Sequence, residues 1–121
     1  MSDARRFVGA FGEGIAKDYL EKHGYEVIQT NFRCSVGEID IVARDKDYIV
    51  FVEVRTRRSS GFGTPEESIT PAKKAKLIDL AHFYLQEHGD PSSLWRIDVV
   101  AVDLGPGGKI SEVRLIRNAI D

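Results

Sequence analysis

Cysteine is almost absent from this chain of 121 residues, which contains only Cys34. An intramolecular disulfide is therefore excluded, and the 3 histidines are too scattered to form a zinc-binding pattern with it. No apolar run approaches the roughly 20 residues that a membrane-spanning helix needs. The N-terminal residues also lack the hydrophobic stretch of a secretory signal. We therefore expect a cytoplasmic protein that has no membrane partner.

A strong charge of one sign is missing as well, since the net charge is −2. This balance argues against a protein that coats nucleic acid nonspecifically with its whole surface, although local basic patches can still bind phosphate. The hydrophobic fraction of 42% and the charged fraction of 30% are typical of a folded globular protein. At this length we expect a single domain over residues 1–121.

Hydrophobic periodicity and turn residues predict the element order αβββαββ. Thr70 as N-cap with Pro71 at the first position starts the second helix, and Gly89 ends it. A helix between two strands normally makes them parallel, so we predict a mixed α/β (α+β) fold whose central mixed β-sheet is flanked by helices. The third strand is nearly all apolar and is expected in the centre. The predicted helices are about 5–23 and 71–88, and the predicted strands are about 25–33, 37–44, 48–56, 95–103 and 110–116.

The stretch "GEIDIVARDKDYIVFVEVRTR" places acidic residues inside two apolar strands, where burying a carboxylate is costly. If Lys46 and Asp47 form a two-residue turn, Asp40 lies opposite Glu53, and directly opposed residues share a face. Arg55 lies two residues beyond Glu53 and shares that face. The register therefore predicts two carboxylates with a cation beside them.

Two adjacent carboxylates repel each other, and a divalent cation that both ligate relieves this repulsion. Magnesium keeps several waters and bridges to substrate phosphate, which suits metal-assisted phosphodiester hydrolysis. The alternative is a cross-strand ion-pair network of Asp40, Glu53 and Arg55 on a half-exposed face. The residues alone leave both interpretations open.

Nearly the whole chain resembles the YraN family of small bacterial proteins. The stretches that carry the resemblance are "GEGIAKDYLEKHGYEVIQTNFR", "GEIDIVARDKDYIVFVEVRTR", "FGTPEESITPAKKAKLIDLAHFYL" and "RIDVVAV". The chain is also more distantly similar to restriction-endonuclease-like nucleases with the motif PD-(D/E)xK. This second resemblance implies a restriction-endonuclease-like domain that uses Mg²⁺ or Mn²⁺.

In the nuclease motif, Asp40 matches the first acid and Glu53 the second, which implies that both bind the metal. Glu13 matches a helical acid of the archaeal Holliday-junction resolvases, although a solvated glutamate is the alternative. The motif lysine falls on Arg55, which departs from the pattern. An arginine can hold phosphate and stabilise negative charge, but it cannot exchange a proton at neutral pH.

Basic residues gather at two places that flank one loop. Arg57 and Arg58 end the third strand, while Lys73 and Lys74 lie in the first turn of the second helix, where free N–H groups also attract anions. We expect all of them to contact a nucleic-acid backbone, the alternative being a solvated basic face. Phe62 is a candidate for base stacking or for core packing.

Together with the resemblance, these residues predict a divalent-metal-dependent endonuclease that acts on DNA. The proposed site consists of Glu13, Asp40, Glu53 and Arg55. If the resolvase similarity extends to function, it implies branched or damaged DNA as substrate and a homodimer as the active form. The alternatives are a noncatalytic nucleic-acid-binding or adaptor module with a degenerate nuclease fold, and a structural ion-pair network in a protein that acts through protein partners. For Asp98, in the fourth strand, pairing with Arg96 or with another cation at the edge of the core is favoured over a place in the site.

Overall fold

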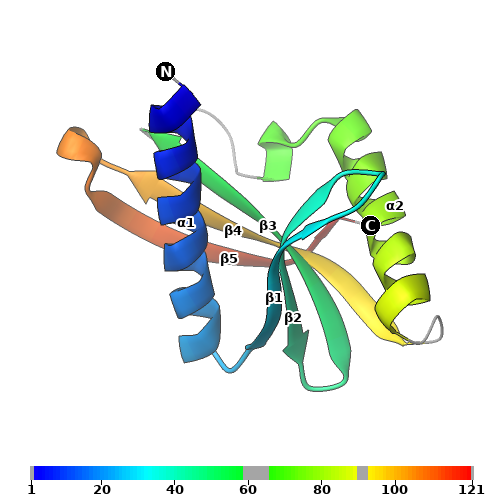
Figure 1. Cartoon of the computed structure of the whole chain (residues 1–121). Coiled ribbons are helices and arrows are strands. Elements are labelled where there is room, and N and C mark those ends of the chain that lie inside the picture. The colour runs from blue at the N-terminus through cyan, green and yellow to red at the C-terminus, as the bar shows by residue number, and fades with distance from the viewer. Residues whose placement is uncertain (1, 59–65, 90–92, 121) are drawn as a thin grey trace.

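The computed structural model describes residues 2–58, 66–89 and 93–120 (Figure 1). The elements follow the predicted order αβββαββ, with two short 3₁₀ helices added. They are α1 (Ser2–Lys22), β1 (Glu26–Arg33), β2 (Glu38–Asp45), β3 (Tyr48–Arg58), η1 (Glu66–Ser68), α2 (Pro71–His88), β4 (Leu94–Leu104), η2 (Pro106–Gly108) and β5 (Ile110–Ile120). Within these residues, no helix is both long enough and apolar enough to cross a membrane.

The strands form one mixed sheet in the order β1-β2-β3-β4-β5. β3 is central and pairs in parallel with β4, whereas the other neighbouring strands are antiparallel. The parallel pair follows from the α2 crossover, as predicted. The mixed sheet flanked by two helices is therefore the fold that the sequence pattern indicates.

The two helices cover opposite faces of the sheet, and each face has its own apolar core (Figure 1). Val50 and Val52 of β3 pack in the cluster that contains α1 residues, while Phe51 between them packs in the cluster that contains α2 residues. Both faces of β3 are covered, and its sequence is therefore a continuous apolar run instead of an alternation of apolar and polar residues.

The ends of α2 are fixed by the residues that the sequence singles out. The Lys73 N–H donates to the Thr70 hydroxyl over 3.1 Å, and Pro71 occupies the first turn. At the other end the Gly89 N–H donates to the Leu85 carbonyl over 3.1 Å. These caps hold the basic first turn of α2 in a defined place above the sheet.

β5 extends to Ile120, further than its predicted end at residue 116. The extension includes a register shift, and Asn118 there has a left-handed φ of 51°. The Asn118 N–H donates to the buried Asp98 carboxylate over 2.9 Å, which compensates for the interrupted ladder. A bond to a residue 20 positions earlier in the chain gives no local signal in the sequence.

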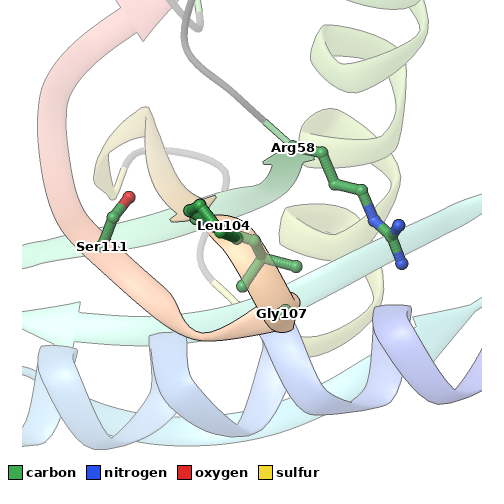
Figure 2. Close-up of a pocket in the computed structure, with 7 residues that line it drawn as sticks. Arg58, Leu104, Gly107 and Ser111 are labelled. Carbon is green, nitrogen blue, oxygen red and sulfur yellow. The ribbon is translucent and has the colours of Figure 1, made fainter.

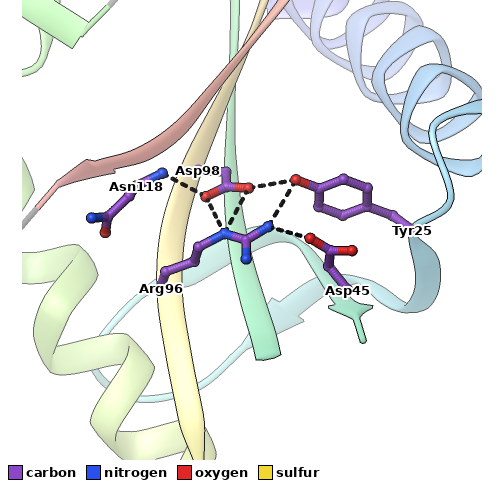
Figure 3. Close-up of polar contacts among 5 residues, drawn as sticks. All are labelled: Tyr25, Asp45, Arg96, Asp98 and Asn118. Carbon is purple, nitrogen blue, oxygen red and sulfur yellow. Dashed lines mark hydrogen bonds and ion pairs between the residues drawn. The ribbon is translucent and has the colours of Figure 1, made fainter. Parts of the chain in front are cut away.

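Asp98 is the centre of a buried polar cluster on the sheet (Figure 3). Its carboxylate accepts from Arg96 Nε over 3.0 Å and from the Tyr25 hydroxyl over 2.9 Å. Arg96 Nη2 also donates to the Asp45 carboxylate over 2.7 Å. The predicted pairing of Asp98 with Arg96 is confirmed. These contacts link β2, β4 and β5 with Tyr25, the residue directly before β1, so the cluster ties these segments together.

The helix α1 approaches β3 most closely at Gly12. A β-carbon added to Gly12 would collide with the Thr56 hydroxyl, whereas one added to Gly14 would meet nothing within 4 Å. Gly12 is therefore the residue that lets α1 lie directly on the sheet.

We expect Gly12→Ala to lower the free energy of unfolding by about 1–3 kcal/mol, because the clash outweighs the helix propensity of alanine. Gly14→Ala, the matched control, should raise it by up to about 1 kcal/mol. Urea denaturation measures both. Adding Thr56→Ala should rescue Gly12→Ala, and equal stability of the two alanine variants would refute the close contact.

Candidate functional site

The hairpin of β2 and β3 has the predicted register. Its ladder runs from Asp45 opposite Tyr48 to Ile41 opposite Val52, and one further step brings Asp40 level with Glu53. The ladder ends at this point, and the Asp40 Oδ2 atom accepts the Val54 N–H over 2.8 Å. Asp40 therefore replaces a backbone partner of β3 and is held at the place where the two strands part.

Three acidic side chains converge beside this point. One carboxylate oxygen each from Glu13, Glu38 and Asp40 lies within 4.8 Å of the other two. Glu13 comes from α1, directly after the close contact of Gly12 with β3, while the other two acids come from β2. The packing of α1 on the sheet thus positions an acid from one helix against two acids of a strand.

Glu53 lies on the other side of Asp40 and is almost fully buried, with 6% of its surface exposed. Its Oε2 atom is 3.6 Å from Arg55 Nε and 3.9 Å from Lys73 Nζ. Arg55 comes from the same strand and Lys73 from the first turn of α2. The site therefore has an acidic side toward α1 and a cationic side toward α2.

The electrostatics of the acids reflect their burial. Burial raises the pKa of Glu53 to about 7, and the negative charge of Asp40 contributes to this rise. The positive charges of Lys73 and Arg55 lower the pKa and so oppose the rise. Burial also raises the pKa of Asp40, although the Val54 N–H opposes the shift. The pKa of Glu13 is raised by burial and then by the charge of Asp40. A bound cation would favour the ionised form of all these acids.

The donor set fits a hard divalent cation. Carboxylate oxygens are the ligands that magnesium and manganese prefer, and Glu13, Glu38 and Asp40 supply them from three residues. Glu53 adjoins this group through Asp40, and the cations beside Glu53 suit a phosphate. Carboxylates that suit a divalent metal and cationic groups that suit a phosphate are therefore neighbours.

Glu38 is an acid of the site that the sequence patterns above did not single out. It forms an ion pair with Arg33 over 3.0 Å and stands two residues before Asp40 on the same strand. Residues two apart on a strand point to the same face, so the spacing in "GEID" is a usable signal. The resemblance to the nuclease motif points to Asp40 and Glu53 instead.

Of the other predicted site residues, Lys73 lies at the site, whereas Arg57 and Lys74 contact groups outside its acids. Arg57, two residues further along β3 than Arg55, pairs with Asp103 over 3.4 Å. Lys74 is half-buried in α2, and its N–H donates to the Thr70 carbonyl. Phe62 falls outside the described residues.

Arg58 belongs to a separate pocket of about 640 Å³ (Figure 2). Leu104, Ser111 and the turn of residues 105–108 form its other walls. Because side chains alternate along a strand, Arg58 points to the face opposite that of Arg57. The basic end of β3 is thus divided between two faces.

The raised pKa of Glu53 predicts a pH-dependent stability. The folded chain retains a proton that the unfolded chain releases, so the free energy of unfolding should fall as pH rises from about 4.5 to 7. We expect a decrease on the order of 2 kcal/mol, which Glu53→Gln removes. Denaturation in chelator at pH 5 and pH 7.5 measures it, with the exposed Glu87→Gln as control. Equal pH dependence in the wild type and Glu53→Gln would contradict the assignment.

Comparison with known proteins identifies relatives that span nearly the whole chain. The model of the uncharacterised protein family UPF0102 matches residues 12–102. A UPF0102 protein of Dehalococcoides mccartyi is 48% identical over 120 residues, which cover 99% of this chain and 98% of the relative. A UPF0102 protein of Caldicellulosiruptor bescii is 43% identical over 113 residues, which cover 93% and 95%. The chain therefore belongs to the UPF0102 family, in agreement with its resemblance to YraN proteins.

Proposed function

We propose that this protein is a divalent-metal-dependent endonuclease that hydrolyses phosphodiester bonds in DNA. The observation that carries the proposal is the convergence of Glu13, Glu38 and Asp40 within 4.8 Å, beside an acid that contacts two cationic side chains. A purely structural network would satisfy its carboxylates, as the Asp98 cluster does. Here burial leaves the pKa values of Glu13, Asp40 and Glu53 raised.

In this proposal Glu13, Glu38 and Asp40 hold Mg²⁺ or Mn²⁺, and Glu53 adds a fourth carboxylate next to Asp40. When bound, the metal polarises the phosphoryl oxygen and lowers the pKa of a water molecule. The Val54 N–H keeps Asp40 in place, which fixes the direction of its carboxylate. Glu13, Glu38 and Asp40 would thus hold the metal at the place where β2 and β3 part.

Arg55 and Lys73 bind the phosphate on the opposite side and stabilise the charge that develops on it. Arg55 keeps its positive charge at all relevant pH values but cannot exchange a proton. Lys73, with its ammonium 3.9 Å from Glu53, supplies the lysine that the motif lacks. The missing lysine of the third strand is in this way replaced from α2.

The resemblance to restriction-endonuclease-like nucleases supports the proposal, because its two acids fall on β2 and β3 of an αβββαββ fold. The proposal includes the features that the resolvase similarity implies, namely branched or damaged DNA as substrate and a homodimer as the active form. It also includes the cytoplasmic location expected from the sequence.

One observation favours a second candidate, a noncatalytic nucleic-acid-binding module. Glu53 has two cationic neighbours within the chain itself, and arginine occupies the lysine position of the motif. In such a module the basic side chains matter and the acids do not. Neutralising Asp40 would then leave DNA binding unchanged or improve it, with no activity to lose.

We predict that the wild type cleaves at least one of branched, nicked or single-stranded DNA in Mn²⁺ or Mg²⁺. Asp40→Asn should lower the rate by about 100-fold or more, since it removes a ligand of the metal. Asp18→Asn, an exposed carboxylate on α1, is the matched control and should keep full activity. Gel electrophoresis of end-labelled DNA measures cleavage.

Chelator should abolish the activity of the wild type, and folding of each variant is checked by thermal unfolding. A folded wild type that binds DNA but cleaves none of these substrates in either metal would reject the nuclease in favour of the binding module. Equal cleavage by the wild type and Asp40→Asn would show that a contaminant is responsible.

A further inference from the structure

Two arginines, one on β3 and one on β5, share an unusual feature. Among the residues that the structure describes, the buried side-chain nitrogen and oxygen atoms without a hydrogen-bond partner are Nε of Arg55 and Nε of Arg114. Each lies 3.6 Å from a carboxylate, that of Glu53 or Glu112, which is too far for a hydrogen bond. A buried N–H without an acceptor lowers the free energy of unfolding by about 1–3 kcal/mol, so a bound acceptor would stabilise either arginine.

The register of the sheet places these arginines in one row. Arg55 of β3 lies beside Ala101 of β4, and Ala101 lies beside Arg114 of β5. Residues beside one another in a sheet point to the same face, so both arginines lie on the face of Glu53. With strands about 4.8 Å apart, their Cα atoms are about 10 Å apart, and two arginine side chains can meet over that distance.

The residue between them, Ala101, is fully buried, so a ligand on this row would lie over the two arginine side chains, which are partly exposed. Ala101 contributes only a methyl group to this face. The next row holds Arg57 of β3 beside Asp103 of β4, and Asp103 also accepts from Arg114 Nη2 over 2.9 Å. This ion pair uses only one nitrogen of the Arg114 guanidinium, and the buried Nε atom has no hydrogen-bond partner.

We propose that Arg55 and Arg114 together bind one phosphate of a nucleic-acid strand, above Ala101 and next to the acids. A phosphate over the exposed parts of the two side chains would offer an acceptor toward which both guanidinium groups can turn, and arginine is suited to bind it through several N–H groups. The strand would then run from the acids of β2 and β3 across β4 to β5. This assignment rests on the proposed function and names Arg114 as a further substrate-binding residue.

The test is nucleic-acid binding, measured separately from cleavage. Fluorescence anisotropy of labelled single-stranded and duplex DNA is recorded with Ca²⁺ in place of Mg²⁺. We expect Arg114→Met to weaken binding by about 10-fold and to reduce the slope of log K against log salt by about 1. The double variant Arg55→Met/Arg114→Met should lose less than the product of the single effects, because both residues hold one phosphate.

Arg117→Met is the matched control, since it removes the same charge from the same strand on the opposite face, where Arg117 lies over the Tyr25 ring at 5.7 Å. It should change binding by less than about 2-fold, as expected for a charge away from the interface. If Arg114→Met does not fold, Arg114→Lys keeps a cation beside Asp103 and should weaken binding by about 3-fold, since lysine lacks the Nε donor.

The outcomes separate this inference from the proposed function. Cleavage by the wild type together with equal binding by Arg114→Met and Arg117→Met would overturn the inference and leave the nuclease intact. Binding that depends on Arg114 without cleavage would support the inference and reject the nuclease. If inorganic phosphate stabilises the wild type but DNA does not bind, the two arginines bind a free anion. That result would overturn the inference that they bind a nucleic-acid strand.

Discussion

The bond from the Val54 N–H to the Asp40 carboxylate is the interaction on which the candidate site depends. It forms where the β2–β3 ladder ends, so the side chain of one strand replaces the backbone partner of the next. Asp40 is thereby fixed between Glu53 on one side and the acids of β2 and α1 on the other. Both helices then add to the site from opposite faces, α1 through Glu13 and α2 through Lys73.

Two polar clusters in the described part of the chain, one around Asp98 and one around Asp40, have different properties. In the Asp98 cluster, both carboxylate oxygens accept hydrogen bonds, and Arg96 neutralises the charge. In the Asp40 cluster, several carboxylates lie close together, and burial raises the pKa values of Asp40 and Glu53. The first arrangement is expected of a cluster that stabilises a fold. The second arrangement lowers the stability of the fold and is expected where side chains are arranged to bind a ligand.

Local rules were sufficient to predict most of the fold. The Thr70–Pro71 start of α2, the turn that pairs Asp45 with Tyr48 and the parallel pair of β3 and β4 all follow from short stretches of sequence. The same register predicted that Asp40 comes level with Glu53. These features depend on residues close in the chain or on the handedness and length of a crossover.

What could not be predicted depends on contacts between distant segments. The extension of β5 depends on Asn118 meeting Asp98. The approach of Glu13 to Asp40 depends on the close packing of Gly12 on Thr56, and only the resemblance implied it. The row of Arg55 and Arg114 exists only through the register of three strands. Glu38 is different, because its spacing from Asp40 was visible in the sequence.

The proposed metal site is tested most directly by calorimetric titration of Mn²⁺ into the wild type, Glu38→Gln and the control Glu87→Gln at pH 7.5. We predict one saturable site in the wild type and the control, and its loss or a weakening of about 10-fold or more in Glu38→Gln. The Glu38 variant tests the structural assignment specifically, because Glu38 belongs to the acidic group of Glu13, Glu38 and Asp40 but is not part of the nuclease motif. No Mn²⁺ binding by the folded wild type, or equal binding by Glu38→Gln, would contradict the metal site formed by Glu13, Glu38 and Asp40.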